Sequence, residues 1–410
     1  GENVYLEIDF GGEALVKING KIAGAVSSGW VNRDSIYLGR LAGGEKLEIK
    51  LEYAVDAGSF CDAAMDGAKN VKYELKKARL VSADEACRAY ETDLNIAWEA
   101  LNYIEDEYIR SKVLRAIDES IHLVDFDFEA DRVRESVKKA AAHLKKCLAE
   151  IEYNSQSEVY MTGHSHIDIA WLWRVQETQR KAARTFSNNL GLMDRYPDFV
   201  FAQSQAILYD TVKRLYPELF ERIKEKVKSG QWEIVGDVWV EADTNIASGE
   251  ALIRQILYGR EFFKNEFGKV SDVYWLPDCF GFSRALPQII RRSGMKYFVT
   301  AKLNSQDTNR FPHTNFRWSD GESGEVLAHM LRMAYGGEYL PADLKRVTDS
   351  NERKAIVSDA LGMYGYGDGG GGCTHTMLEH AKRLKNFPGL PKSRLASPEE
   401  FFKKLEESFE

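Results

Sequence analysis

Two side chains that could bind one metal ion are separated by a single residue in the segment 163–173, which reads GHSHIDIAWLW. His166 and Asp168 follow a strand expected at 159–162. Because residues two apart in an extended chain point the same way, the imidazole and the carboxylate can meet at one cation. Nitrogen and oxygen donors together suit zinc or a neighbouring transition metal. A simple His–Asp hydrogen bond is the alternative for so short a motif, and the position after a strand favours the metal pair.

A third candidate ligand, Asp278, lies in the segment 275–283, which reads WLPDCFGFS. It comes just after a strand expected at 273–276, and the neighbouring Pro277 and glycine fix the backbone. An aspartate that caps the next helix is the alternative. A third carboxylate would complete three protein ligands for one metal ion.

Two further features could contact a ligand. The segment 364–372 reads YGYGDGGGG, and its glycines let the backbone approach a ligand closely around Asp368. It lacks the Lys-Ser/Thr ending of a phosphate-binding loop, and a flexible loop is the alternative. Trp171 and Trp173 could form an apolar wall for a sugar ring, although such tryptophans more often belong to the core.

The elements that would position these residues alternate between strand-like and helix-like patterns beyond Tyr153. Expected strands cover 159–162, 199–202, 232–240, 273–276 and 297–300, and expected helices cover 211–228, 249–267 and 284–292. Such alternation predicts a parallel sheet, open or closed into a barrel, whose chemistry collects at the carboxyl ends of the strands. Each of these strand ends is followed by polar groups, which also include Gln203, Gln205, Glu241, Asp243, Asn245, Lys302, Asn304 and Asp307.

The sequence before this region predicts two other units. Apolar residues alternate over the first ten positions and again over 47–53, with a hairpin signal at Asn19-Gly20, which predicts part of a β-sandwich over 1–83. From about Asp84 the apolar period becomes helical, and packing helices are expected over 84–155. One apolar stripe consists of Leu94, Trp98, Leu101, Ile104 and Tyr108. The β/α unit would then cover 156–410.

Charge and cysteine content argue against several classes of partner. The chain has 410 residues, with 55 Lys+Arg against 63 Asp+Glu and a formal net charge of -8. No cluster of basic and aromatic residues is present, so we expect no nucleic acid partner. No apolar run is long enough to cross a bilayer, so no membrane partner is expected. Five cysteines without a C-x-x-C pair fit reduced thiols and a cytoplasmic location.

The segments 163–173 and 275–283 resemble the two signature segments of glycoside hydrolase family 38, the α-mannosidases. The segments WVEADTN at 239–245 and RFPHT at 310–314, with the glycine tract, look like the branch that includes the cytosolic and many bacterial enzymes. The likeness runs from about Glu158 to the end of the chain. Upstream, 11–20 is similar to the galactose-binding-like sandwich that precedes the catalytic domain in that branch.

This resemblance implies a seven-stranded parallel β/α barrel with one zinc or cobalt ion. It implies that His166, Asp168 and Asp278 are metal ligands, and that Asp278 is also the nucleophile. By the same resemblance Trp171 stacks on the sugar ring, and Asp243 hydrogen-bonds the sugar. The substrates would be oligosaccharides with terminal α-mannosides.

A retaining mechanism also requires a second carboxylic acid about 5–5.5 Å from the nucleophile. The motifs do not identify it, and Asp307, Asp368 and Glu338 are candidates. Asp368 is also a candidate for substrate binding.

In the family a fourth ligand, a histidine, follows the glycine tract, and this chain ends before a matching residue. We therefore expect a fragment that binds metal weakly, has little or no activity and can self-associate through exposed apolar patches. A metal-dependent polysaccharide deacetylase is one alternative, but it needs a second histidine pair at helical spacing, which the sequence lacks. A carbohydrate-binding module without catalysis is the other.

Overall fold

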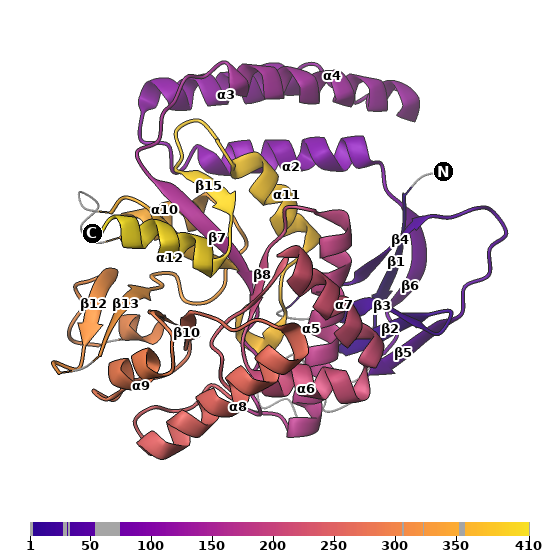
Figure 1. The fold of residues 1–410 in the computed structure, drawn as a ribbon. Helices are drawn as coiled ribbons and strands as arrows, with labels where there is room; N and C mark the ends of the chain where they lie inside the picture. Colours follow the sequence, from indigo (N-terminus) through magenta and orange to yellow (C-terminus); the bar gives the residue numbers. More distant parts are fainter. Residues whose placement is uncertain are drawn as a thin grey trace.

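The computed structural model describes residues 3–27, 31, 33–53, 74–305, 307–322, 324–351 and 357–409. Along the chain it contains a pair of small sheets, a layer of three helices and a larger unit of alternating strands and helices (Figure 1). Of the five cysteines, Cys61 lies outside the described residues, and the other four are free thiols. Among the described helices, none combines the length and apolar character that crossing a bilayer requires.

Six strands near the start of the chain make two three-stranded antiparallel sheets, with the orders β4-β1-β6 and β3-β2-β5. A small apolar core that includes Leu6, Val16 and Ile36 holds them together. The expected turn at Asn19-Gly20 joins β2 to β3, and both residues have the positive φ that a tight hairpin requires. The strands are β1 (Asn3–Asp9), β2 (Glu13–Ile18), β3 (Lys21–Ser27), β4 (Ser35–Arg40), β5 (Ile49–Tyr53) and β6 (Lys77–Ser82).

Three helices follow: α2 (Glu85–Ala100), α3 (Glu107–Ile121) and α4 (Ala130–Ala149). The apolar stripe expected over 94–108 is wrong at two positions, since Trp98 is 61% exposed and Tyr108 is 69% exposed. For Tyr108 the physical reason is that α2 ends at Ala100 and α3 begins at Glu107, with the side chain of Asp106 capping the first turn of α3. That new start resets the helical phase.

The larger unit contains two sheets that are mostly parallel. One has the order β14-β7-β8-β9, with β15 also paired to β7, and the other has the order β10-β11-β13-β12, in which only β12 is antiparallel. The amide of Gly236 donates to Val273 O at 2.9 Å and connects the end of β9 to β10. The strands are β7 (Glu158–His164), β8 (Phe201–Gln203), β9 (Trp232–Ile234), β10 (Val273–Trp275), β11 (Tyr297–Thr300), β12 (Asn315–Ser319), β13 (Glu325–Met330), β14 (Ala360–Tyr364) and β15 (Lys392–Leu395).

Helices surround these strands (Figure 1). They are α5 (Val175–Arg195), α6 (Ala206–Leu215), α7 (Pro217–Ser229), α8 (Gly249–Phe267), α9 (Leu286–Arg292), α10 (Pro341–Asp349), α11 (His375–Leu384) and α12 (Pro398–Glu407), with short 3-10 turns η1 (Lys302–Asn304) and η2 (Asp368–Gly370).

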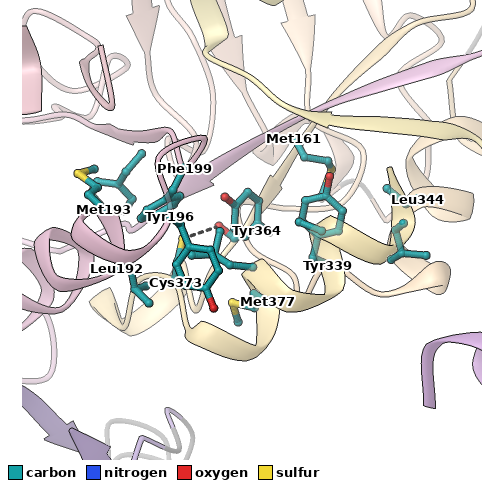
Figure 2. Close-up of a cluster of buried hydrophobic side chains, with 14 of the residues drawn as sticks. Met161, Leu192, Met193, Tyr196, Phe199, Tyr339, Leu344, Tyr364, Cys373 and Met377 are labelled. Atoms are coloured by element: carbon teal, nitrogen blue, oxygen red, sulfur yellow. Dashed lines mark hydrogen bonds between the residues drawn. The ribbon is translucent and has the colours of Figure 1, made fainter. Parts of the chain in front are cut away.

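One buried cluster takes side chains from all the parallel strands from β7 to β14 except β9, together with Val235 directly after β9, and α12 packs against it through Phe401 and Phe402. A larger core lies between the strands and the helices α5, α10 and α11. Figure 2 shows part of that core, in which the thiol of Cys373 donates to Tyr364 O at 3.6 Å. The core thereby fixes the glycine tract against β14.

Three expectations about these elements need correction. The strand expected over 232–240 ends at Ile234, because Gly236 and Asp237 have positive φ and leave the extended conformation. The helix expected over 211–228 is two helices separated at Tyr216, since Pro217 disfavours a helical residue before it. A closed seven-stranded barrel is not confirmed, since no backbone ladder joins β13 to β14 in the described residues.

Candidate metal centre and active site

The structure brings His166, Asp168 and Asp278 together. His166 Nε2 lies 3.4 Å from Asp168 Oδ1 and 3.5 Å from Asp278 Oδ2. One possible ligand atom from each residue lies within 4.8 Å of the others. The imidazole is buried, whereas the two carboxylates are partly exposed to solvent. An imidazole nitrogen and two carboxylate oxygens that converge in this way could hold one divalent cation.

The loop after β7 places the first two of these residues. The amide of His166 donates to Gly367 O at 2.8 Å, which ties the loop to the glycine tract. Gln205 holds the same loop from the other side, because its Nε2 donates to Ile167 O at 2.9 Å and its Oε1 accepts from the amide of Glu241 at 3.2 Å. Gln205 has φ of 68°, an uncommon backbone conformation for a residue with a side chain. These contacts join the segments that follow four neighbouring strands, β14, β7, β8 and β9.

Asp278 is held from two directions. Its Oδ1 accepts a hydrogen bond from Tyr335 OH at 3.0 Å and lies 2.7 Å from Lys302 Nζ, while Oδ2 faces His166. Lys302 belongs to η1, directly after β11, and its ammonium group also lies over the ring of Phe280. The carboxylate therefore has a fixed orientation and one oxygen directed at the metal site.

Negative charge is concentrated around His166. Burial by itself lowers the pKa of His166, but the carboxylates of Glu241, Asp168 and Asp278 outweigh burial and raise that pKa to about 9. Glu241 is part of the same group, since its Oε2 lies 3.5 Å from His166 Nδ1. Burial raises the pKa of Glu241 to about 7, although His166 and the hydroxyl of Ser204 oppose the rise. A bound cation would neutralise this excess of carboxylates, so the donor set fits a metal ion.

Of the other predicted site residues, Asp368 lies near this group, and Trp171 has a half-exposed side chain. Trp171 is 49% exposed, and its ring contacts the edge of Trp173. Burial raises the pKa of Asp368, as do the carboxylates of Asp278 and Asp168, while His166 opposes them. Asp368 therefore lies where a ligand at the metal centre could contact it.

The remaining candidates make other contacts. Asp243 accepts hydrogen bonds from the amides two and three residues ahead, at 2.8 and 3.0 Å, so its carboxylate stabilises its own loop. Glu338 accepts a hydrogen bond from Tyr366 OH at 3.4 Å. Asp307 is exposed in the loop after η1. In the part of the chain that the structure describes, none of these three forms a hydrogen bond or ion pair with the three candidate ligands.

Sequence reasoning left three residues of the site without a role. Glu241 and Lys302 carried a signal, because each was noted among the polar residues that follow a strand, but nothing distinguished them from their neighbours. Tyr335 gave no signal, since it lies in an irregular segment after β13 and reaches Asp278 only through the tertiary fold.

Comparisons with known proteins match this chain to one family. Residues 156–409 match the sequence profile described as "Glycosyl hydrolases family 38 N-terminal domain". "Alpha-mannosidase G" of Dictyostelium discoideum is 36% identical over 406 residues, which are 96% of this chain and 37% of that protein. "Alpha-mannosidase 2C1" of Mus musculus is 34% identical over 413 residues, or 99% of this chain and 39% of that protein. The chain therefore spans about two fifths of the length of these relatives.

A solved structure supports the fold alone. The crystal structure of an alpha-mannosidase from Enterococcus faecalis V583 superposes with a TM-score of 0.51 at 19% sequence identity. The superposition covers 61% of this chain and 29% of that protein.

Proposed function

The chain belongs to family 38 of the glycosyl hydrolases, and from this membership we propose that it carries the metal site and the nucleophile of a retaining α-mannosidase. The substrates would be terminal α-mannosides of oligosaccharides. The observation that carries the proposal is the convergence of His166, Asp168 and Asp278 within 4.8 Å, although they follow strands of two different sheets, β7 and β10. The long N-terminal matches to α-mannosidases support the same activity.

In this proposal His166, Asp168 and Asp278 hold one zinc or cobalt ion. The bound ion would bind sugar hydroxyl groups and favour the distorted ring of the transition state. Because the pKa of His166 is raised, the imidazole is protonated at neutral pH when no metal is bound, and it would release this proton when a metal ion binds to it.

Asp278 is the proposed nucleophile. A carboxylate oxygen attacks the anomeric carbon as the bond to the leaving oxygen breaks, and water later hydrolyses the covalent sugar ester. Lys302 and Tyr335 support this role, because both contact Asp278 Oδ1 and keep the carboxylate in a single orientation.

For the general acid we favour Asp368 over Asp307 and Glu338. A general acid must remain protonated near neutral pH until it donates its proton, so a raised pKa is the expected property. The pKa of Asp368 is raised by burial and by the carboxylates of the metal centre, whereas Glu338 is engaged by Tyr366. Asp368 would give its proton to the leaving oxygen and take one from water in the second step.

Trp171 and Asp243 are the proposed sugar contacts. The half-exposed ring of Trp171 is available for stacking on a sugar. Asp243 would have to reach the sugar with the oxygen that does not cap its loop.

The architecture beyond these residues is also a proposal. We infer a seven-stranded barrel from the single core that the parallel strands share. The proposed units are a partial sandwich over 1–83, a helical segment over 84–155 and the catalytic unit over 156–410, of which 156–409 match the family profile. A cytoplasmic location rests on the free thiols, and self-association remains a further expectation.

The test is hydrolysis of an aryl α-mannoside by this chain and, in parallel, by a chain extended past Glu410. Asp278→Asn should lower kcat/KM by at least about 1,000-fold, as expected for loss of a nucleophile. Asp272→Asn is the matched control, because Asp272 directly precedes β10, the strand before Asp278, and its side chain pairs with Lys296 at the surface. Activity that survives Asp278→Asn would refute the assignment. Release of acetate from acetylated oligosaccharides would favour a deacetylase, and sugar binding without either reaction would favour a binding module.

A further inference from the structure

A second group of metal-binding side chains lies on the helical layer. Glu119 belongs to α3, whereas His143 and Cys147 are one turn apart on α4. His143 Nε2 lies 3.0 Å from Glu119 Oε2 and 3.4 Å from Cys147 Sγ. The three possible ligand atoms all lie within 4.8 Å of one another. The sequence assigned no chemistry to His143, because Glu119 approaches it only when α3 packs against α4.

The spacing of these atoms suits a tetrahedral ion. Zinc binds imidazole nitrogen and carboxylate oxygen at about 2.0–2.2 Å and thiolate sulfur at about 2.3 Å. Tetrahedral angles then place nitrogen and oxygen about 3.3 Å apart and nitrogen and sulfur about 3.5 Å apart. Both observed separations are within a few tenths of an ångström of these values, and both involve the same Nε2 atom. One ion could therefore bind all three ligands with small side-chain movements.

The group is partly exposed to solvent, and a neighbouring arginine orients one of its side chains. The side chains of His143 and Glu119 are 34% and 35% exposed, so an ion can enter and water can occupy a fourth position. Arg115 Nε donates to Glu119 Oε1 at 2.6 Å, which leaves Oε2 directed at His143. A residue that orients a ligand in this way is a common feature of metal sites.

The location separates this group from the proposed active site. The helices α3 and α4 lie along one side of the molecule (Figure 1), whereas His166, Asp168 and Asp278 follow the strands β7 and β10. The two groups also differ in chemistry, because the active-site group contains no sulfur ligand and this one contains a thiol.

We propose that Glu119, His143 and Cys147 form a second transition-metal site, selective for Zn²⁺ or Co²⁺ over Mg²⁺ or Ca²⁺ because it offers sulfur and nitrogen donors. The thiol loses its proton to solvent when the ion binds. Since the ligands come from two helices, the ion joins α3 to α4 and stabilises the helical layer. Ions that bind the folded state alone raise its stability by mass action.

The experiment is a Co²⁺ titration of the metal-free chain in a non-chelating reductant. Thiolate coordination gives a near-ultraviolet charge-transfer band that ligands with nitrogen and oxygen alone do not give. We expect one thiolate-bound cobalt per chain in the wild type and in Asp168→Asn. The band should be absent in Cys147→Ser. In His143→Gln, which keeps every thiol, affinity should fall at least about tenfold, since loss of a residue that only supports a ligand already costs about 10–100-fold.

Cys87→Ser is the matched control, because Cys87 is another half-buried helical thiol and its loss should leave the band intact. Circular dichroism shows whether each variant remains folded. A wild type without the band at saturating Co²⁺ would overturn the proposal, as would a band that persists in Cys147→Ser or an unchanged affinity in His143→Gln. In the Asp168→Asn background, Zn²⁺ should raise Tm, and Cys147→Ser should abolish that rise.

Discussion

Glu13→Gln should destabilise the protein and reduce its dependence on pH. Glu13, on β2, is buried between two cations of α5: its carboxylate lies 3.1 Å from Lys181 Nζ and 2.7 Å from an Arg184 nitrogen. Arg184 also pairs with Glu177 on the same helix. The substitution would leave the ammonium of Lys181 buried without its carboxylate partner.

The size of the effect follows from the pKa of Glu13. Burial alone would raise this pKa, but Lys181 and Arg184 lower it from 4.5 to about 2. Because the folded-state pKa is depressed, the stabilisation is complete above about pH 4.5 and is lost as the pH falls through 2. At 1.36 kcal/mol per pKa unit, the contribution at pH 7 is about 3 kcal/mol. Removal of one partner from a buried ion pair typically costs about 3–5 kcal/mol, which agrees.

The measurement is urea unfolding of wild type and variant at pH 7 and pH 3. The difference in the free energy of unfolding should be about 3 kcal/mol at pH 7 and about 1–1.5 kcal/mol at pH 3. At pH 3 the wild-type carboxylate is mostly protonated in the unfolded state but still ionised in the folded state. Proton binding then stabilises the unfolded wild type and reduces the advantage of Glu13. Glu48→Gln is the control, since the exposed Glu48–Lys50 pair should contribute less than about 1 kcal/mol. A loss below about 1 kcal/mol at pH 7, or a loss independent of pH, would refute this reasoning.

Three further predictions concern the site and its support. If the proposed function holds, Tyr335→Phe removes the hydrogen bond to Asp278 and should lower kcat for an aryl α-mannoside about 5- to 30-fold without a change in Tm, whereas equal kcat values would contradict the role of the hydroxyl. Trp171→Ala should raise KM about 5- to 30-fold with kcat nearly unchanged, and an unaltered KM would exclude stacking. Gly259→Ala improves helix propensity by about 1 kcal/mol, but the added Cβ would lie 2.4 Å from Asp237 O. Thermal unfolding should therefore show a lower Tm, and a higher Tm would mean that α8 shifts to accommodate the methyl group.

Much of the fold that positions the site could be read from local patterns. The helix expected over 249–267 has those bounds in the structure, because Ser248 caps its first turn and Gly268 ends it in a left-handed conformation. Where a left-handed residue or a proline interrupted a pattern, as at Asp237 and Pro217, the predicted bounds were wrong. Apolar periodicity also mistook the exposed Trp98 for a core residue, because periodicity does not show where a partner surface ends.

The sequence by itself determined the three candidate metal ligands. Each follows a parallel strand, and the carboxyl ends of such strands carry the chemistry in β/α folds, so His166, Asp168 and Asp278 were candidates before the structure brought them together. Only the tertiary structure decided that Tyr335 donates a hydrogen bond to Asp278 and that Lys302 forms an ion pair with it. Tyr335 lies in an irregular segment, and no local pattern indicates which distant residue it contacts. Glu119 and His143 lie on two regular helices, and they meet only because α3 packs against α4.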